Sequence, residues 1–333
     1  MTVASRCVRP APSAEIGSGA HTGAAPIGGA RMPTGADLRY LCLSMTFRVS
    51  TWNCFGMGQG LDAVTAIRAP FGDRLRRDEV IAECAAADVL CVQEIFSQEA
   101  QHFFDGVGRE RFLSRFRDDN GVRFATMRGT GLGVSARGRF EKRGLDVFPG
   151  ERVGWDRLAR KGALYTQIVL EGGVVIDLVT AHLQAGQDEG AVRVRAAQLR
   201  HLKSMVASVG SPDRAMIVCG DLNIDGLAAA RGEPEYVRLA AAFEGFEDLG
   251  AAADLPTFDP HPERNALAHA FYPEESAQRI DYVLWRAGRG ADLRCVGLTR
   301  FFDRPLAQPA PRAGASAWAS DHFGLTATFE LHR

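Results

Sequence analysis

Asp221 and Asn223 stand one residue apart, just after an apolar run that ends at Gly220. An apolar run that stops at a glycine predicts a buried strand ending in a tight turn. Because alternate residues of an extended segment face the same way, the carboxylate and the carboxamide can point together into one cleft. The first group accepts hydrogen bonds or protons and the second donates, which suits a phosphate and its attacking water. The alternative is an ordinary turn, since Gly, Asp and Asn are common turn residues.

Several other apolar runs also end in polar groups that can handle a metal ion or a phosphate. These groups are Asn53, Glu94, His182, Asp281, and Asp321 with His322. An ionised carboxylate is costly to bury unless a cation or another partner accompanies it. Each group taken alone also fits a structural role, as an exposed strand end or a hydrogen-bonded core residue. Together they predict one site that many loops assemble on a rigid scaffold.

The periodicity of apolar residues indicates which elements carry these groups. Alternating or continuous apolar runs predict strands, and an apolar residue every three or four positions predicts helices. The expected strands cover residues 47–56, 88–94, 162–170, 174–184, 217–220, 278–285 and 319–330, and the expected helices cover 78–87, 98–106 and 192–209. Gly172 and Gly173 predict a hairpin. Residues 129–137 are glycine-rich but lack the Lys-Ser/Thr of a nucleotide-binding loop, so we expect a strand with close backbone approach.

The composition is that of an ordinary globular protein. Of the 333 residues, 46% are hydrophobic and 24% are charged, which fits one large layered domain or two smaller ones. The formal net charge of −1 gives no global basic field that would favour nucleic acid. Residues 109–161, however, contain fourteen Lys and Arg and seven Asp and Glu. This segment could face an anionic interface or a phosphate headgroup, or form a solvated arginine-rich surface.

Cysteine spacing and hydropathy exclude several other classes of protein. The seven cysteines include no Cys-x-x-Cys pair, so we expect neither a disulfide framework nor a structural zinc site. No apolar run reaches the ~18 residues of a transmembrane helix. Residues 1–44 are rich in Gly, Ala, Pro and Ser and lack the apolar core of a signal peptide, so we expect a disordered tail or an over-extended start. The cytoplasm is the default location, with secretion left open.

With these residues in view, the chain resembles the endonuclease/exonuclease/phosphatase superfamily. The matching segments are Trp52-Asn53, Gln93-Glu94, Thr180-Ala181-His182, Gly220-Asp221-Leu222-Asn223, Arg279-Ile280-Asp281-Tyr282 and Ser320-Asp321-His322. As an ordered set they are specific, and they span nearly all of residues 45–333. The resemblance implies one catalytic domain over 45–333, after the 1–44 tail. It also implies an α/β fold, a four-layered DNase-I-like sandwich of two packed mixed β-sheets flanked by helices.

Further details are similar to the neutral sphingomyelinases within that superfamily. They are Asp156 with Lys161-Gly162 before a strand, the run Thr180–Ala185, Arg195 with Gln198-Leu199, Pro256–Pro260 with Asn265 and Leu267, and Arg279–Leu284. The resemblance implies that Lys161, Asp156 and Asn265 belong to the substrate-binding part of the site.

The resemblance also implies a role for each residue at the strand ends. Glu94, helped by Asn53, would hold Mg²⁺, because this hard cation prefers oxygen ligands. One or two ions would bind, and Mn²⁺ or Co²⁺ could substitute for Mg²⁺. His322 would activate water as the general base, and Asp281 would fix its tautomer. The remaining implied roles are phosphate binding for His182 and Asn223, positioning of water or assistance to the leaving oxygen for Asp221, and a second-metal or supporting role for Asp321.

The function that follows is a Mg²⁺-dependent phosphodiesterase that converts sphingomyelin to ceramide and phosphocholine. A nuclease or an inositol-phosphate phosphatase on the same fold is the first alternative, because fold does not fix substrate. A catalytically silent binding module is the second, although every polar position of the core site is filled. We expect only transient contact with a membrane surface, through Phe301, Phe302 and Trp318, and no stable protein partner.

Overall fold

Two mixed β-sheets of six strands each form the centre of the computed structural model, which describes residues 45–57, 74–118, 129–290, 292–308 and 316–332. The first sheet has the strand order β11-β12-β1-β2-β4-β3. Its strands are β1 (Met45–Gly56), β2 (Val89–Ile95), β3 (Ser114–Arg117), β4 (Gly133–Ala136), β11 (Asp292–Phe301) and β12 (Gly324–His332). Strand β1 pairs in parallel with β2 and antiparallel with β12.

The second sheet has the order β5-β6-β7-β8-β10-β9. Its strands are β5 (Arg139–Val147), β6 (Gly162–Val169), β7 (Val175–His182), β8 (Ala215–Asp221), β9 (Glu247–Asp248) and β10 (Asp281–Arg286). Strands β7 and β8 are parallel, and β10 runs antiparallel to β8. Both sheets are therefore mixed, as expected.

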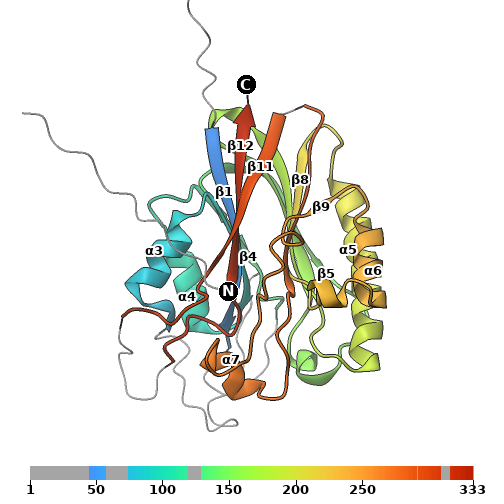
Figure 1. Cartoon of the computed structure of the whole chain (residues 1–333). Coiled ribbons are helices and arrows are strands. Elements are labelled where there is room, and N and C mark those ends of the chain that lie inside the picture. The colour runs from blue at the N-terminus through green and yellow to red at the C-terminus, as the bar shows by residue number, and fades with distance from the viewer. Residues whose placement is uncertain (1–44, 58–73, 119–128, 291, 309–315, 333) are drawn as a thin grey trace, which may run out of the picture. The chain divides into compact units, whose positions relative to one another are not determined.

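The two sheets pack face to face and helices cover both outer faces (Figure 1). The helices are α3 (Asp78–Ala86), α4 (Gln98–Gly106), α5 (Glu189–Val209), α6 (Pro234–Ala242) and α7 (Ala266–Phe271). Between the sheets, side chains such as Val49 and Ile217 form one apolar core. Helices α3 and α4 cover the first sheet, and α5 and α6 cover the second. These four layers confirm the fold class.

Local sequence explains why the helices start where they do. Ser97 accepts a hydrogen bond from Ala100 N at the start of α4, and Asp188 accepts one from Ala191 N at the start of α5. The Asp188 cap lets α5 begin three residues before the expected 192, because capping rather than apolar periodicity sets the first turn. Helices α3 and α4 match the expected ranges to within one residue.

The expected turns and strands are largely present. Gly172 and Gly173 both have positive φ in the connection between β6 and β7, which are antiparallel neighbours. Gly133 begins β4, and a Cβ there would lie 2.7 Å from the side chains of Ile95 and Phe104. The close backbone approach expected for residues 129–137 is therefore confirmed. The last strand starts at Gly324 instead of residue 319, so Asp321 and His322 lie in the loop before it.

The expectation that Phe301, Phe302 and Trp318 form a membrane-contacting surface is wrong for two of the three. Phe301 and Trp318 are buried, at 9% and 6% exposure, in apolar clusters on the outer side of the first sheet and beside α7. Phe302 is half-buried and its ring lies 4.8 Å from that of Trp52. Aromatic residues in a Pro- and Arg-rich stretch looked like surface residues, but they fill gaps in the core.

The basic segment 109–161 is largely engaged by other protein groups where the structure describes it. Arg115 donates to the carbonyls of Phe104 and Val107, and Arg117 pairs with Asp105 at 2.9 Å. Arg137 Nη1 lies 2.7 Å from Asp88 Oδ1. These contacts favour the interpretation of an ordinary arginine-rich surface.

Three further observations concern the chain as a whole. Five cysteines lie in the described part, namely Cys54, Cys84, Cys91, Cys219 and Cys295, and all are free thiols. Among the described helices, none has both the length and the apolar character needed to cross a membrane. The tail expected over residues 1–44 lies outside the described residues, so its separation from the catalytic domain stays a prediction.

Replacement of Gly220 by alanine should destabilise the fold strongly. Gly220 has φ of 127°, which L side chains rarely adopt, and a Cβ there would overlap the backbone of Ala181 on the neighbouring strand β7. We expect Gly220→Ala to lower the free energy of unfolding by about 3 kcal/mol or more, measured by urea denaturation.

Gly144→Ala is the matched control, because Gly144 is also a strand glycine, on β5, and a Cβ at this residue would have no other atom within 4 Å. We expect its stability to change by about 0.5 kcal/mol or less. Equal effects of the two substitutions would contradict the close approach of β7 and β8 at Gly220.

Candidate active site

The polar strand ends of both sheets meet at one place. In the second sheet, His182 on β7 is in register with Asp221 on β8, and Asp221 is in register with Asp281 on β10. In the first sheet, Asn53 on β1 and Glu94 on β2 lie near the carboxyl ends of two parallel strands. The loop before β12 brings in Asp321 and His322. The structure therefore brings together all the residues predicted from the strand ends.

Asn53 connects the two sheets within the site. Its Nδ2 donates to Glu94 Oε1 at 3.1 Å and to Asp221 Oδ2 at 3.0 Å. Its Oδ1 accepts from Phe55 N at 3.0 Å, so the amide nitrogen faces the carboxylates. In this arrangement Asn53 sets the separation of the two acids, and a direct oxygen contact with a metal ion would require rotation of the amide.

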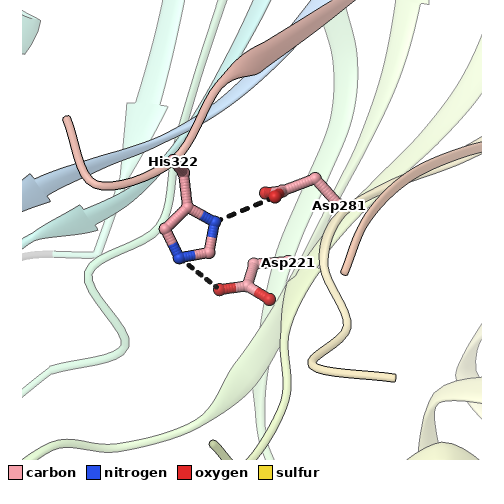
Figure 2. A group of neighbouring side chains, drawn as sticks. All are labelled: Asp221, Asp281 and His322. Carbon is pink, nitrogen blue, oxygen red and sulfur yellow. Dashed lines mark hydrogen bonds and ion pairs between the residues drawn. The ribbon is translucent and has the colours of Figure 1, made fainter. Parts of the chain in front are cut away.

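Asp281 and His322 form a hydrogen-bonded pair (Figure 2). His322 Nδ1 donates to Asp281 Oδ2 at 2.9 Å, and His322 Nε2 lies 3.8 Å from Asp221 Oδ2. Thr257 Oγ1 accepts from Asp281 N at 3.0 Å and so holds the start of β10. Burial acts to lower the His322 pKa, but the carboxylates of Asp281, Asp321 and Asp221 outweigh it and raise this pKa well above its usual value.

His182 lies against a buried cation. Lys161 Nζ is 2.7 Å from His182 Nε2 and 3.0 Å from Asp156 Oδ1. Burial, followed by the positive charges of Lys161 and His322, lowers the His182 pKa well below its usual value, so the ring is neutral. A neutral ring that accepts from Lys161 at Nε2 carries its proton on Nδ1, and Nδ1 has no hydrogen-bond partner among the described residues. The other nitrogen, Nε2, lies 3.4 Å from Asp221 Oδ2 and 3.9 Å from Glu94 Oε1, so the His182 ring faces the acids of the site through Nε2.

Asn223 and Asp321 complete the polar lining of the site. Asn223 N donates to Asp221 Oδ1 at 3.0 Å, and its Nδ2 donates to Leu183 O at 3.1 Å. Asn223 has φ of 52°, and this left-handed turn directs its backbone N–H to Asp221. Asp321 Oδ1 accepts from Ser320 Oγ at 3.1 Å. Both Asn223 and Asp321 line the pocket.

The three residues expected to bind substrate occupy different positions. Asp156 lines the pocket and also accepts from Ala185 N at 2.7 Å. Lys161 is buried against His182 and does not line the pocket. Asn265 is fully buried and does not line the pocket. Its oxygen caps α7, and its Nδ2 donates to the carbonyls of Ser320 and Asp321. Its observed contacts position the loop that carries His322, and substrate contact by Asn265 stays a prediction.

The site opens into a pocket of about 270 Å³. Its lining combines polar side chains with aromatic ones. The lining comprises Phe55, Met57, Glu94, Val153, Gly154, Asp156, His182, Gln184, Ala185, Gly186, Gln187, Asp188, Asp221, Asn223, Phe258, Tyr272, Glu275, Gln278, Ile280, Asp321 and His322.

The carboxylates of this pocket fit a divalent cation. Burial and the nearby charge of Asp321 raise the Glu94 pKa to about 7, and burial raises the Asp221 pKa to about 6. Glu94 Oε2 is buried without a hydrogen-bond partner among the described residues. Crowded acids with a free buried oxygen are the donor set that Mg²⁺ prefers, and a cation would relieve their repulsion.

A second group of potential ligands lies beside Glu94. Ligand atoms of Asp221, Asp281 and His322, one from each residue, lie within 4.8 Å of one another. However, His322 Nδ1 and Asp281 Oδ2 already bond to each other, so a metal bound by all three would have to replace that hydrogen bond. Glu94 with Asp221 is therefore the better starting point for a single ion, and the three-residue group is a candidate second site.

Sequence reasoning missed several residues that shape the site. Ser320 Oγ donates to Asn53 O at 2.7 Å and accepts from His322 N at 3.2 Å, so it joins the last loop to β1. Tyr272 and Glu275 line the pocket from the segment after α7. Ser320 could have been found, because it belongs to the matched segment Ser320-Asp321-His322. Tyr272 and Glu275 could not have been found in this way, because no apolar run ends beside them.

Comparison with known proteins decides the family. A sequence model of the endonuclease/exonuclease/phosphatase family matches residues 50–322, from β1 to His322. The chain belongs to this family. No curated protein sequence matches it. Membership of this family and the candidate metal site together indicate a hydrolase of the phosphodiesterase type.

Solved structures with the same fold include a sphingomyelinase C, a beta toxin and TDP2. Sphingomyelinase C from Streptomyces griseocarneus has 20% identity and a TM-score of 0.66, covering 85% of this chain and 99% of that one. A double mutant of beta toxin from Staphylococcus aureus, solved with bound magnesium ions, has 17% identity and a TM-score of 0.63, covering 85% and 99%. TDP2 from D. rerio, solved with a single-strand DNA product, has 19% identity and a TM-score of 0.62, covering 85% and 98%. At these identities the likeness shows the shared fold.

Binding of Mg²⁺ to the protein should strengthen as the pH rises through about 7. Without metal, Glu94 keeps its proton up to about pH 7, and a cation must displace that proton. We expect the apparent affinity to rise by up to about tenfold per pH unit below this pKa and to level off above it. Isothermal titration calorimetry in buffers of different ionisation enthalpy measures both the affinity and the protons released.

Glu94→Gln is the control, because glutamine keeps the shape of the side chain and cannot ionise. This variant should bind Mg²⁺ more weakly and with a flatter pH dependence. If the wild-type affinity were independent of pH, or if Glu94→Gln bound the ion as the wild type does, Glu94 would not be a ligand.

Proposed function

We propose that the protein is a Mg²⁺-dependent phosphodiesterase that cleaves sphingomyelin into ceramide and phosphocholine. The observation that carries the proposal is the Asp281–His322 pair, which presents His322 Nε2 beside Asp221 at 3.8 Å. Asp221 is joined through Asn53 to Glu94. A candidate base, a carboxylate that can position water and a carboxylate that can hold a cation therefore share one pocket.

Each side chain has a chemical task in this proposal. Asp281 keeps the proton of the His322 ring on Nδ1, so Nε2 can accept a proton from the attacking water. As the water oxygen bonds to phosphorus, the bond from phosphorus to the ceramide oxygen breaks. Asp221, with a pKa raised to about 6, can position that water or give a proton to the departing oxygen. Donation from the Asn223 amide, together with phosphate binding by His182, would stabilise the charge that grows on the phosphoryl oxygens.

The metal fits the same arrangement. Glu94, with Asn53 beside it, would hold Mg²⁺, which polarises phosphoryl oxygens and offsets the charge that develops on them. Positive charge close to Asp221 and Asp321 would also bring the raised His322 pKa toward the range in which the ring acts as a base.

Two observations support a lipid with a zwitterionic headgroup as the substrate. The lining of the pocket includes six carboxylates, which repel an extended polyanion such as DNA. The lining also includes the apolar side chains of Phe55, Met57 and Phe258. Sphingomyelinase C and beta toxin are among the structures with this fold. Because TDP2 with a DNA product shares the fold too, nuclease activity is the alternative to test.

A small panel of hydrolysis assays, each run with Mg²⁺ and with EDTA, tests the proposed substrate. We expect release of phosphocholine from sphingomyelin in mixed micelles with Mg²⁺, and none with EDTA. The other substrates are phosphatidylcholine, a lysolipid, single-stranded DNA and an inositol phosphate. Cleavage of DNA or of the inositol phosphate alone would keep the site chemistry and reject the lipid substrate.

Replacement of His322 by alanine should abolish most of the turnover and leave the protein folded. A positioned general base typically contributes a factor of about 10² to 10⁴, and His322→Ala should lower kcat by that amount on whichever substrate the panel identifies. His201→Ala is the matched control, because His201 also pairs with a carboxylate, Asp146 at 2.7 Å, but lies on α5 outside the pocket. Retained turnover in His322→Ala, at unchanged Mg²⁺ affinity, would reject His322 as the base.

A further inference from the structure

An aromatic wall leads from the reacting groups to the rim of the pocket. The ring of Phe258 lies 5.5 Å from that of His322 and 5.5 Å from that of Tyr272, in an edge-on arrangement with Tyr272. The ring of Phe271 lies 6.3 Å from that of Tyr272. Both Phe258 and Tyr272 line the pocket. A group attached to a phosphate at His322 would therefore extend along aromatic faces.

The position of Tyr272 is coupled to that of His322. Tyr272 ends α7, and its N–H donates to Ala268 O. The start of the same helix is capped by Asn265, whose Nδ2 also holds the carbonyls of the loop that carries His322. One buried side chain thus fixes both the aromatic wall and the base, as a binding subsite beside a reacting group requires.

Among the acids that line the pocket, Glu275 is the one that other groups use least. The acids that contact other protein groups or lie at the metal and phosphate positions are Glu94, Asp156, Asp188, Asp221 and Asp321. Glu275 lies at the exposed rim, and Gln278 Nε2 donates to its Oε2 at 3.3 Å. Its Oε1 has no hydrogen bond to any described residue. A cationic part of the substrate could take this free oxygen as its counter-charge.

We infer that Tyr272 and Glu275 form the subsite for the quaternary ammonium of the substrate's headgroup. A trimethylammonium group has no N–H to donate, so hydrogen-bond acceptors cannot orient it, whereas an aromatic face attracts it and a nearby carboxylate adds charge. Burial, followed by the negative charges of Asp321, Glu94, Glu275 and Asp156, raises the pKa of the Tyr272 hydroxyl well above its usual value, so this end of the pocket is negative. The inference rests on the proposed phosphodiesterase function and names the residues that select the choline headgroup.

The test is the binding of phosphocholine and of inorganic phosphate to the full chain in Mg²⁺, measured by isothermal titration calorimetry. We expect the wild type to bind phosphocholine about tenfold or more tightly than phosphate, because the ammonium adds a cation–π contact and an ion pair. Glu275→Gln should reduce this ratio by about five- to tenfold. Glu274→Gln removes the same charge one residue away, outside the pocket lining, and should leave the ratio unchanged.

Variants at Tyr272 separate the ring from its hydroxyl and from its structural role. Tyr272→Phe keeps the aromatic face and should keep most of the phosphocholine preference. Tyr272→Leu removes the aromatic face and should lower the preference for phosphocholine over phosphate by about tenfold. The thermal unfolding midpoint of this variant is measured alongside. If Tyr272→Leu unfolds, the comparison of Tyr272→Phe with Glu275→Gln still tests the subsite. The subsite requires that Glu275→Gln loses the phosphocholine preference and that Tyr272→Phe keeps it. Equal loss from Glu275→Gln and Glu274→Gln would show a long-range charge effect and overturn the subsite.

Failure of the subsite is distinguishable from failure of the proposed function. Cleavage of sphingomyelin with the same kcat/KM in Glu275→Gln and wild type would keep the function and reject the subsite. Absence of sphingomyelin cleavage, with a phosphocholine preference that depends on Glu275, would keep the subsite and assign it to another choline phosphodiester. Tighter binding of a single-stranded oligonucleotide than of phosphocholine, unaffected by Glu275→Gln, would reject the subsite in favour of base stacking on Tyr272.

Discussion

The site depends on the seam between the two sheets. Asn53 on the first sheet donates to Glu94 on that sheet and to Asp221 on the second. A further polar contact crosses the seam where Gln93 Nε2 donates to Thr180 Oγ1 at 3.0 Å. Because the acids belong to different sheets, their separation is fixed only when the apolar core between the sheets is fully packed. Packing of the core therefore sets the distances between the acids of the site and is also the main source of stability.

This arrangement has an electrostatic cost that the fold has to offset. Asp221 and Asp321 are buried and Glu94 is half-buried in the same pocket, and loss of solvation raises the pKa of each carboxyl. Groups of like charge held together in a dry pocket destabilise the folded state, and such strain is typical of functional sites. The hydrogen bonds that Asn53 and Ser320 give to these carboxylates reduce the cost and fix their orientation. Stability and chemistry are thus opposed at the same few residues.

The sequence alone predicted the parts of the site that sit at the ends of apolar runs. Glu94, His182 and Asp221 were found because a buried strand ending in a polar group is unusual, and the register of β7 and β8 then places two of them side by side. Contacts made far along the chain were not predictable from local pattern. The cap that Asn265 supplies to α7, and the pocket position of Tyr272, depend on how loops fold over the sheets. The aromatic residues Phe301 and Trp318 were misjudged because a Pro-rich stretch does not reveal which side faces the core.

The order of strands in the first sheet has a consequence for how the protein is made. Strand β12, near the end of the chain, lies between β11 and β1, and the loop just before it carries His322. During synthesis, almost the whole domain must emerge before β12 is available to pair with β1. This pairing joins residues very far apart in the sequence, so it is slow to form. His322 therefore reaches the acids in the same step that completes the sheet. A partly synthesised chain has one unpaired edge of β1, which can pair with other chains and promote aggregation. The same chain has no assembled site, so catalysis by the unfinished protein is not expected.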